Sequence, residues 1–212
     1  MIFITLEGID GSGKTTIAKI VKEKILEKGF DVILTREPGG EEISEAIRNL
    51  ILDKNNTEMT HWTEALLYIA SRKQHIDKKI IPALKSGKIV ICDRFMDSTT
   101  VYQGYARGIG MAEIDQVQNV VIGSAKPDLT IFFDITPKEA QIRLTSRTRS
   151  PDRLDLEDSN FHQTVYEGYQ LLISDNTERI KVVDARKSVN EVVQQVEFLI
   201  NEVIVERLNS KK

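Results

Sequence analysis

A glycine-rich stretch near the start of the chain has the residue types and spacing of a phosphate-binding loop. Residues 8–15 read Gly-Ile-Asp-Gly-Ser-Gly-Lys-Thr, which matches the P-loop pattern G-x-x-x-x-G-K-[ST]. Glycines let successive backbone N–H groups surround phosphate oxygens. Lys14 supplies a cation for the terminal phosphates, and the Thr15 hydroxyl is placed to bind Mg²⁺. The predicted nucleotide-binding residues are Gly8, Asp10, Gly11, Ser12, Gly13, Lys14, Thr15 and Thr16.

A second informative position follows a later apolar run. Asp93 comes directly after Ile-Val-Ile-Cys at 89–92, an arrangement in which P-loop proteins place a carboxylate near Mg²⁺ or its waters. Arg94 follows, and a guanidinium at a phosphate-binding edge suits a second anionic substrate. We therefore predict that Thr15 and Asp93 bind the metal. Lys14 and Arg94 are the predicted catalytic cations.

Strands and helices alternate along the chain. Apolar runs predict strands at 2–6, 31–35, 88–92, 129–133 and 180–183. Helical spacing predicts helices at 14–28, 41–52, 62–86, 97–106, 111–123, 137–146 and 159–174, with a last one from 189 onward. Continuous apolar strands alternating with helices indicate an α/β fold of three layers, a five-stranded parallel sheet with helices on both faces.

The expected topology gathers the candidate residues at one edge of the sheet. In parallel α/β sheets, ligands bind beyond the carboxyl ends of the strands. That rule places the P-loop beside Arg36-Glu37, Asp93-Arg94 and Asp134. Within the long helix at 62–86, Pro82 is expected to cause a kink, because proline lacks a backbone N–H.

Composition narrows the class of protein. The 212 residues are expected to form a single domain, 1–212, with no internal repeat or linker. A net charge of -3 provides no general attraction to nucleic acid or to anionic membranes. Cys92 is the only cysteine, so an intramolecular disulfide is excluded and an intracellular setting is expected. With no signal peptide and no apolar run near the roughly 20 residues of a membrane span, we expect a cytoplasmic protein.

Several separate segments together resemble the thymidylate kinase family, P-loop enzymes that move the γ-phosphate of ATP onto dTMP. The run 93–104, Asp-Arg-Phe-Met-Asp-Ser-Thr-Thr-Val-Tyr-Gln-Gly, is the most specific to that family. The other segments are Glu7–Thr16, Thr35–Gly40, Ala70–Arg72, Tyr105–Gly108 and Lys126–Thr130. The resemblance covers nearly the whole chain. It implies the P-loop kinase fold with a mobile lid, ATP and dTMP as substrates, Mg²⁺, and a homodimer.

The resemblance also implies roles for residues at the phosphate side of the acceptor. Asp10 is expected to accept a hydrogen bond from the 3′-hydroxyl of the acceptor sugar. Arg94, together with Arg36 or Arg48, is expected to contact the acceptor phosphate, Arg48 being the family's match. Pro38 corresponds to a position that is often cis in the family.

For the acceptor base and sugar, the resemblance implies a second set of contacts. Tyr68 is expected to stack on thymine, Arg72 to hydrogen-bond its O4 edge, and Thr99 to face N3. Tyr102 is expected to lie against the deoxyribose, with Gln103 in the same wall. If these positions did not align with the family's motifs, their side chains would be interpreted as core, helix-start or solvated residues. Glu37 and Ser98 complete the predicted substrate-binding set.

Four arginines at 143, 147, 149 and 153 surround a polar loop. Such a cluster is usually a solvated surface, but in a phosphoryl-transfer enzyme it can belong to a lid that closes over ATP. One branch of the family carries an arginine inside the P-loop, where this chain has Gly11. The chain therefore resembles the bacterial branch, which supplies the cation from the lid, here about 143–157. Arg149 or Arg153 is predicted to reach the transferred phosphoryl group, Arg143 to bind the nucleotide, and Glu157 to approach the sugar.

Two alternatives stay open from the residues alone. The chain could be a kinase of another nucleoside monophosphate or of a deoxynucleoside, in which case Glu37 is the obvious base for a 5′-hydroxyl. It could also be a nucleotide-dependent switch that has no small-molecule acceptor. A switch would not need the base-reading set Tyr68, Arg72 and Thr99.

Overall fold

A computed structural model describes residues 1–145 and 153–209. Within these residues, five strands form one sheet in which every pair is parallel, in the order β2-β3-β1-β4-β5. The strands are β1 (Ile2–Glu7), β2 (Val32–Arg36), β3 (Ile89–Asp93), β4 (Leu129–Asp134) and β5 (Ile180–Asp184). The five predicted strands are all present, and the α/β fold with a five-stranded parallel sheet is confirmed.

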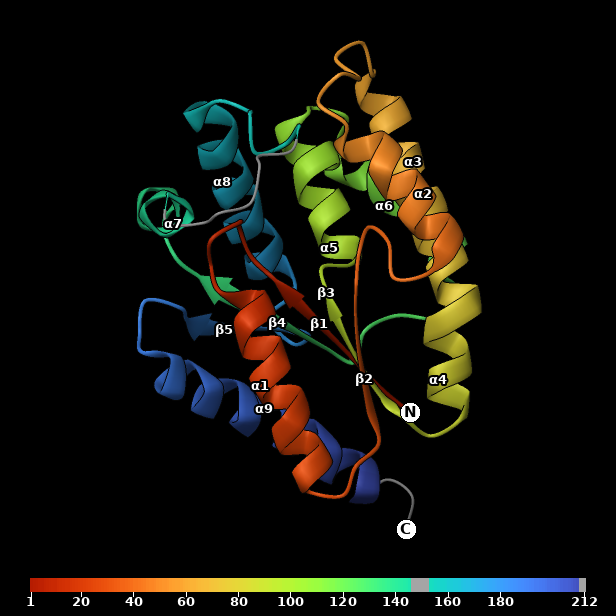
Figure 1. The fold of residues 1–212 in the computed structure, drawn as a ribbon, viewed down its shortest axis with the longest axis vertical. Helices are drawn as coiled ribbons and strands as arrows, with labels where there is room; N and C mark the ends of the chain where they lie inside the picture. Colours follow the sequence, from red (N-terminus) through yellow and green to blue (C-terminus); the bar gives the residue numbers. More distant parts are fainter. Residues whose placement is uncertain (146–152, 210–212) are drawn as a thin grey trace.

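Helices cover both faces of this sheet (Figure 1). They are α1 (Lys14–Glu27), α2 (Glu42–Leu52), α3 (His61–His75), α4 (Ile81–Lys85), α5 (Met96–Thr99), α6 (Met111–Ile122), α7 (Pro137–Leu144), α8 (Ser159–Asp175) and α9 (Val189–Asn209). Two π-helical segments, η1 (Ile76–Ile80) and η2 (Thr100–Ala106), continue α3 and α5. None of the helices in the described ranges is long and apolar enough to cross a membrane.

The core follows the period-two alternation of the strands. Ile4 and Leu6 of β1 lie in a buried cluster with apolar residues of α1 and α9. Phe3 faces the other way, into a second cluster formed with η1, α4 and β3. Because both faces of the strands are buried, β1 and β3 are nearly uniform apolar runs.

The predicted helix at 62–86 is replaced by three consecutive helical segments, α3, η1 and α4. Pro82 lies in the first turn of α4 and has no N–H to donate to the preceding turn. The Ile81 N–H bonds to the Ile76 carbonyl, so the helix widens just before the proline. A π-helical turn, in which each hydrogen bond spans five residues, is thus how the helix accommodates the bond that Pro82 cannot make. The predicted helix at 97–106 is likewise α5 followed by π-helical η2.

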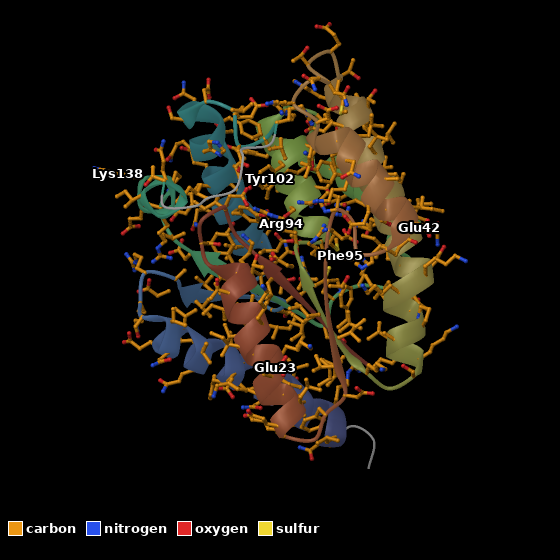
Figure 2. The ribbon with its side chains drawn as sticks, viewed as in Figure 1. Glu23, Glu42, Arg94, Phe95, Tyr102 and Lys138 are labelled. Carbon is orange, nitrogen blue, oxygen red and sulfur yellow. The ribbon has the colours of Figure 1, made fainter. Side chains whose placement is uncertain are left out.

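The carboxyl edge of the sheet collects the polar residues that end the strands. Asp93 is level with Leu6 of β1 and with Arg36 of β2. Figure 2 shows Arg94 and Tyr102 inside the molecule, whereas Glu42 and Lys138 point outward. Helix α7 ends at Leu144, before the predicted boundary at 146. Residue 146 lies outside the described residues.

Candidate active site

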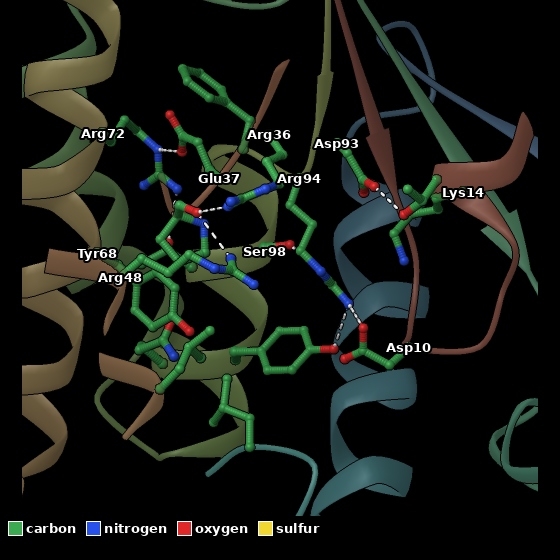
Figure 3. A pocket seen from close by; sticks show the side chains of 18 of the residues that line it. Asp10, Lys14, Arg36, Glu37, Arg48, Tyr68, Arg72, Asp93, Arg94 and Ser98 are labelled. Carbon is green, nitrogen blue, oxygen red and sulfur yellow. Dashed lines mark hydrogen bonds and ion pairs between the residues drawn. The ribbon is translucent and has the colours of Figure 1, made fainter. Parts of the chain in front are cut away.

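A cavity of about 520 Å³ opens at the carboxyl edge of the sheet (Figure 3). Lys14 and Asp93 lie at its phosphate-loop end, and Tyr68 and Arg72 lie at its α3 end. Arg94 lies between them. The predicted site residues that line this cavity are Asp10, Gly11, Gly13, Lys14, Thr15, Glu37, Arg48, Tyr68, Arg72, Asp93, Arg94, Ser98, Thr99, Tyr102 and Gln103. Residues from five separate segments of the sequence are thus brought to one cavity.

The phosphate-loop end is built by the turn from β1 into α1. Gly13 has φ 92° and caps α1 without a side-chain hydrogen bond, so the first backbone N–H groups and the positive end of the helix dipole are available to an anion. The Lys14 ammonium donates to the carbonyls of Gly8 (2.8 Å) and Ile9 (3.0 Å) and to Ser12 Oγ (3.2 Å). Burial, followed by Arg94, lowers the pKa of Lys14 to about 8.

Gly11 is held against helix α7. Its φ is 86°, a conformation that side chains rarely adopt. A Cβ at this position would lie 2.5 Å from the carbonyl oxygen of Ala140, closer than two such atoms can approach. The helix therefore excludes any side chain here, arginine included.

Thr15 and Asp93 meet at the mouth of the cavity. The Thr15 hydroxyl donates to Asp93 Oδ2 at 2.5 Å. A hydroxyl and a carboxylate are hard oxygen ligands of the kind that Mg²⁺ prefers. The two residues therefore fit a magnesium ion held together with nucleotide phosphates.

Arg94 is surrounded by acceptors. Its Nη2 atom lies 3.1 Å from Asp10 Oδ1 and donates to the Tyr102 hydroxyl at 3.2 Å. The guanidinium also lies over the Tyr102 ring, 5.1 Å from its centroid. Its Nη1 atom donates to Ser98 Oγ (3.0 Å) and to the Tyr169 hydroxyl (3.3 Å). These contacts fix a cation in the middle of the cavity.

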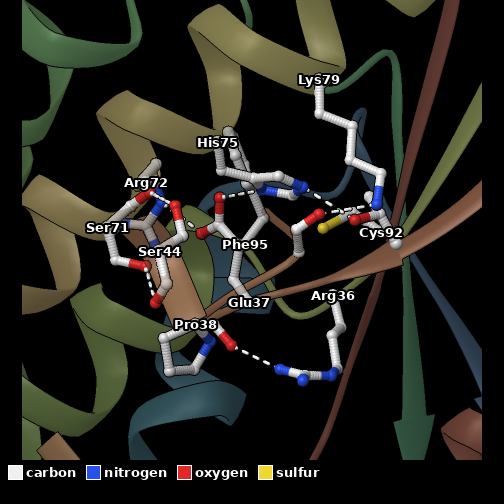
Figure 4. Close-up of polar contacts among 12 residues, drawn as sticks. Arg36, Glu37, Pro38, Ser44, Ser71, Arg72, His75, Lys79, Cys92 and Phe95 are labelled. Carbon is white, nitrogen blue, oxygen red and sulfur yellow. Dashed lines mark hydrogen bonds and ion pairs between the residues drawn. The ribbon is translucent and has the colours of Figure 1, made fainter. Parts of the chain in front are cut away.

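A buried charge network lies at the α3 end. Arg72 is 1% exposed and Glu37 is 4% exposed; Nε of Arg72 donates to Glu37 Oε2 at 2.7 Å. The other guanidinium nitrogens donate to Gln118 Oε1 (2.8 Å) and Thr99 Oγ1 (3.1 Å). His75 bonds to the second oxygen of Glu37 at 3.0 Å (Figure 4). The cation, the carboxylate and their polar partners thus satisfy one another inside the protein.

The turn after β2 positions two further arginines. The Glu37-Pro38 peptide bond is cis, as predicted. The Pro38 carbonyl accepts hydrogen bonds from Arg36 Nη1 (2.7 Å) and from Arg48 Nη1 (2.9 Å). Arg36 is also paired with Glu45 at 2.9 Å. Both guanidinium groups line the cavity.

Two walls of the cavity come from helices. Tyr68 is half-buried on α3. Gln103 of η2 donates to Glu64 Oε1 at 2.8 Å and lies in the same wall as Tyr102. A π-helical turn often occurs at functional sites, and here it presents both η2 residues to the cavity.

Several predicted residues do not line the cavity. Arg143 donates to the Ala185 carbonyl at 2.9 Å. Arg153 donates to the Ile51 carbonyl at 2.9 Å and is paired with Glu64, so its guanidinium is bonded to α2 and α3. Gly8 and Ser12 belong to the loop and Thr16 to the first turn of α1; none of the three lines the cavity. The positions 147 and 149 of the other two arginines lie outside the described residues.

The structure adds residues that the sequence pattern does not reveal. Glu7 ends β1, is 1% exposed, and accepts hydrogen bonds from Ser98 Oγ and the Tyr169 hydroxyl. Burial, followed by Asp97, raises its pKa. His75 and Gln118 hold the Glu37–Arg72 pair. Two features of the sequence point to Glu7: it ends an apolar run, and it begins the family-like segment Glu7–Thr16.

Comparison with known proteins agrees with this geometry. The family model described as thymidylate kinase matches residues 6–196. A thymidylate kinase of Mycoplasma capricolum is 51% identical over 206 residues, 97% of each chain. One of Oceanobacillus iheyensis is 48% identical, over 97% of this chain and 92% of its own. A solved thymidylate kinase of Ehrlichia chaffeensis superposes with a TM-score of 0.75 at 36% identity, covering 94% of this chain and 98% of its own. This chain belongs to the thymidylate kinase family.

Proposed function

We propose that this chain transfers the γ-phosphoryl group of ATP to dTMP and releases dTDP and ADP. One observation carries the proposal: a single cavity joins the P-loop to an α3 end that bears an aromatic ring and a fixed guanidinium. A nucleotide switch needs only the first of these ends. Kinases of a nucleoside monophosphate need both.

The phosphate-loop end is the proposed donor site. The loop backbone and Lys14 hold the ATP phosphates, with Gly8, Gly11, Ser12, Gly13 and Thr16 shaping the loop and the start of α1. Thr15 and Asp93 would hold Mg²⁺, which, when bound, supplies positive charge to the phosphate oxygens. Arg143 contributes to nucleotide binding from α7.

The rest of the cavity is the proposed acceptor site. Tyr68 stacks on the base, while Arg72 and Thr99 address its O4 and N3 edges. Tyr102 and Gln103 face the deoxyribose. The residues proposed to contact the sugar hydroxyl and the phosphate are Asp10, Arg36, Arg48, Arg94 and Ser98. Glu37 contributes to the acceptor site by holding Arg72.

The reaction depends mainly on how the protein positions the two nucleotides and its own cations. The phosphate of dTMP is ionised at neutral pH, so no general base is required for its attack on the γ-phosphorus. Lys14 and Arg94 stabilise charge on the two phosphoryl groups as the bond to the leaving ADP breaks. A lid arginine, Arg149 or Arg153, contributes a further cation when the lid region 143–157 covers ATP.

A coupled assay of ADP release tests the function. Purified chain with ATP and Mg²⁺ is given dTMP, dUMP, UMP, CMP, AMP, GMP or thymidine in turn. We expect the highest kcat/KM with dTMP. A preference for AMP or for thymidine would support a different kinase, and ADP release that is independent of every acceptor would support a switch.

We also infer that residues 1–212 act as one domain and as a homodimer in the cytoplasm, where ATP is the available donor. The apolar side chains that project from α2, α3 and α6 support the dimer. They are Ile43, Leu50, Trp62, Leu66 and Val120, each at least 44% exposed, and burying such a patch favours association. Sedimentation of the wild type and of Leu66→Glu tests this. We expect the variant to be monomeric.

A further inference from the structure

The carboxylate of Glu7 is saturated with hydrogen bonds. Oε1 accepts from the backbone N–H groups of Phe95 (2.8 Å) and Ser98 (3.3 Å). Oε2 accepts from Ser98 Oγ (2.7 Å) and from the Tyr169 hydroxyl (2.8 Å). A carboxylate has about four acceptor positions, and these four donors occupy them. Four donors on one carboxylate favour its ionised form, against the burial that raises its pKa. Glu7 itself does not line the cavity, although Phe95 and Ser98 do.

The Ser98 and Tyr169 hydroxyl groups link Glu7 to Arg94. Because the Ser98 and Tyr169 hydrogens point to Glu7, the oxygen lone pairs are left for Arg94 Nη1, at 3.0 and 3.3 Å. A hydroxyl has one hydrogen and two lone pairs, so Glu7 decides which way each group faces. Without that acceptor either hydroxyl could turn its hydrogen toward the guanidinium and repel it.

Glu7 also acts on the backbone at Arg94. Arg94 has φ 68° and is the only non-glycine residue with positive φ in residues 1–145 and 153–209. Its N–H donates to the Leu6 carbonyl at 2.9 Å, and the next N–H, of Phe95, donates to Glu7. The last two residues of β1 thus hold both sides of a strained residue, and strain of this kind persists only when its surroundings impose it.

We propose that Glu7 is a positioning residue that sets the Arg94 guanidinium for the acceptor phosphate, acting through Ser98 and Tyr169. The inference rests on the proposed function in one respect, the assignment of Arg94 to dTMP. Tyr169 belongs to α8 and Ser98 to α5, so Glu7 joins two helices of the acceptor wall to the end of the central strand.

Tyr169→Phe tests the proposal with the smallest change, since it removes only the hydroxyl. Tyr166→Phe is the matched control: Tyr166 lies on the same helix, and its hydroxyl donates to the Asp134 carboxylate at 3.0 Å instead. For Tyr169→Phe we expect KM for dTMP to rise about tenfold, with KM for ATP within about twofold of wild type, the size of one hydrogen bond to a charged group. Tyr166→Phe should keep the wild-type values.

Glu7→Gln tests the same proposal with a larger expected effect. Its amide still fills the space but offers one acceptor oxygen in place of two, so we expect KM for dTMP to rise by more than about tenfold. If this variant fails to fold, the comparison of Tyr169→Phe with Tyr166→Phe still tests the proposal. Equal changes in both KM values, or a lower Tm with unchanged kinetics, would show a merely structural role and overturn the proposal.

A double-mutant cycle tests whether the effect passes through Arg94. In an Arg94→Met background, Tyr169→Phe should cause no further rise in KM for dTMP, because its partner is gone. A persisting tenfold rise would overturn the proposal while leaving the proposed function intact. If the wild type prefers another acceptor, the function fails, and the same cycle is then measured with that acceptor.

Discussion

The two ends of the cavity differ in how their cations are held. At the α3 end, Arg72 and Glu37 form an ion pair in which both side chains are almost fully buried, 1% and 3% exposed. At the phosphate-loop end, the Lys14 ammonium bonds to carbonyls of its own loop. One end is fixed before any ligand arrives, whereas the other end uses bonds that a phosphate can replace.

This contrast indicates that the two ends have different tasks: one selects the acceptor base, and the other is completed only when the nucleotide binds. A guanidinium locked among Glu37, Gln118 and Thr99 loses little freedom on meeting a base, so the proposed acceptor end selects by shape and hydrogen bonding. Lys14 must exchange carbonyl partners for phosphate oxygens. The proposed donor end is therefore completed by the nucleotide.

The largest effect is expected from removing the P-loop lysine. Lys14→Ala should lower kcat about a thousandfold, because a cation in a preorganised site contributes on this scale, while circular dichroism remains that of the wild type. Lys19→Ala, on the exposed side of the same helix, is the matched control. Near-normal turnover by a folded Lys14→Ala chain would refute the donor site.

The fixed character of the α3 end predicts a large loss of stability. Arg72→Met leaves the buried Glu37 carboxylate beside His75 without its main partner, and breaking a buried pair costs about 3–5 kcal/mol. Arg186→Met is the control, because Arg186 and Asp184 form a surface pair with 56% and 31% exposure. Such a pair contributes about 0–1 kcal/mol. Equal losses in urea unfolding would mean that the two pairs are equivalent and that the α3 end is not preorganised.

Much of this contrast could be predicted from local patterns. The P-loop spacing predicted Lys14 and Thr15, and the apolar runs predicted the five strands found in the described part of the chain. Since parallel strands place their carboxyl ends together, the meeting of Thr15 with Asp93, 78 residues apart, followed from the fold class. These inferences need only a periodicity and a topology rule.

The partners of the buried charges could not be predicted in this way. Glu7 bonds to Tyr169, 162 residues away, and Glu37 bonds to His75, 38 residues away. Such pairs depend on how helices pack over the sheet, and neither helix period nor strand alternation encodes it. Gly11 makes the same point. The sequence shows that position 11 is a glycine, but only the position of Ala140 in α7 explains why no side chain fits there.

The lid arginines provide a sharper test of the phosphate-loop end. Arg149→Met should lower kcat about a hundredfold if that residue supplies the cation at the transferred group. Arg153→Met should lower kcat only about tenfold, because its guanidinium already bonds to the Ile51 carbonyl and to Glu64. Steady-state kcat at saturating ATP and dTMP measures both. The reverse order would show that Arg153 leaves Glu64 during the reaction.

The smallest predicted effect comes from the pKa of Lys14, which burial lowers from 10.5 to about 8. Only the protonated ammonium attracts phosphate, so ATP binding should weaken as the pH rises through about 8. Between one unit below and one unit above that pKa, the protonated fraction falls about tenfold. The Lys14 contribution to the stability of the ligand-free chain has the opposite sign. Between pH 8 and 10.5 the unfolded chain binds the extra proton, so that contribution rises with pH.

Wild type and Lys14→Met compared from pH 7 to 9 separate this residue from every other titrating group. ATP affinity, measured by calorimetry, should fall about tenfold in the wild type and should change much less in the variant. The difference in unfolding free energy between the two chains should move in favour of the wild type above pH 8. If ATP affinity has the same pH dependence in both chains, Lys14 does not titrate in this range. Its ammonium would then be held charged by Asp93, Asp10 and Glu7, the carboxylates that oppose the shift, and the phosphate-loop end would be as fixed as the α3 end.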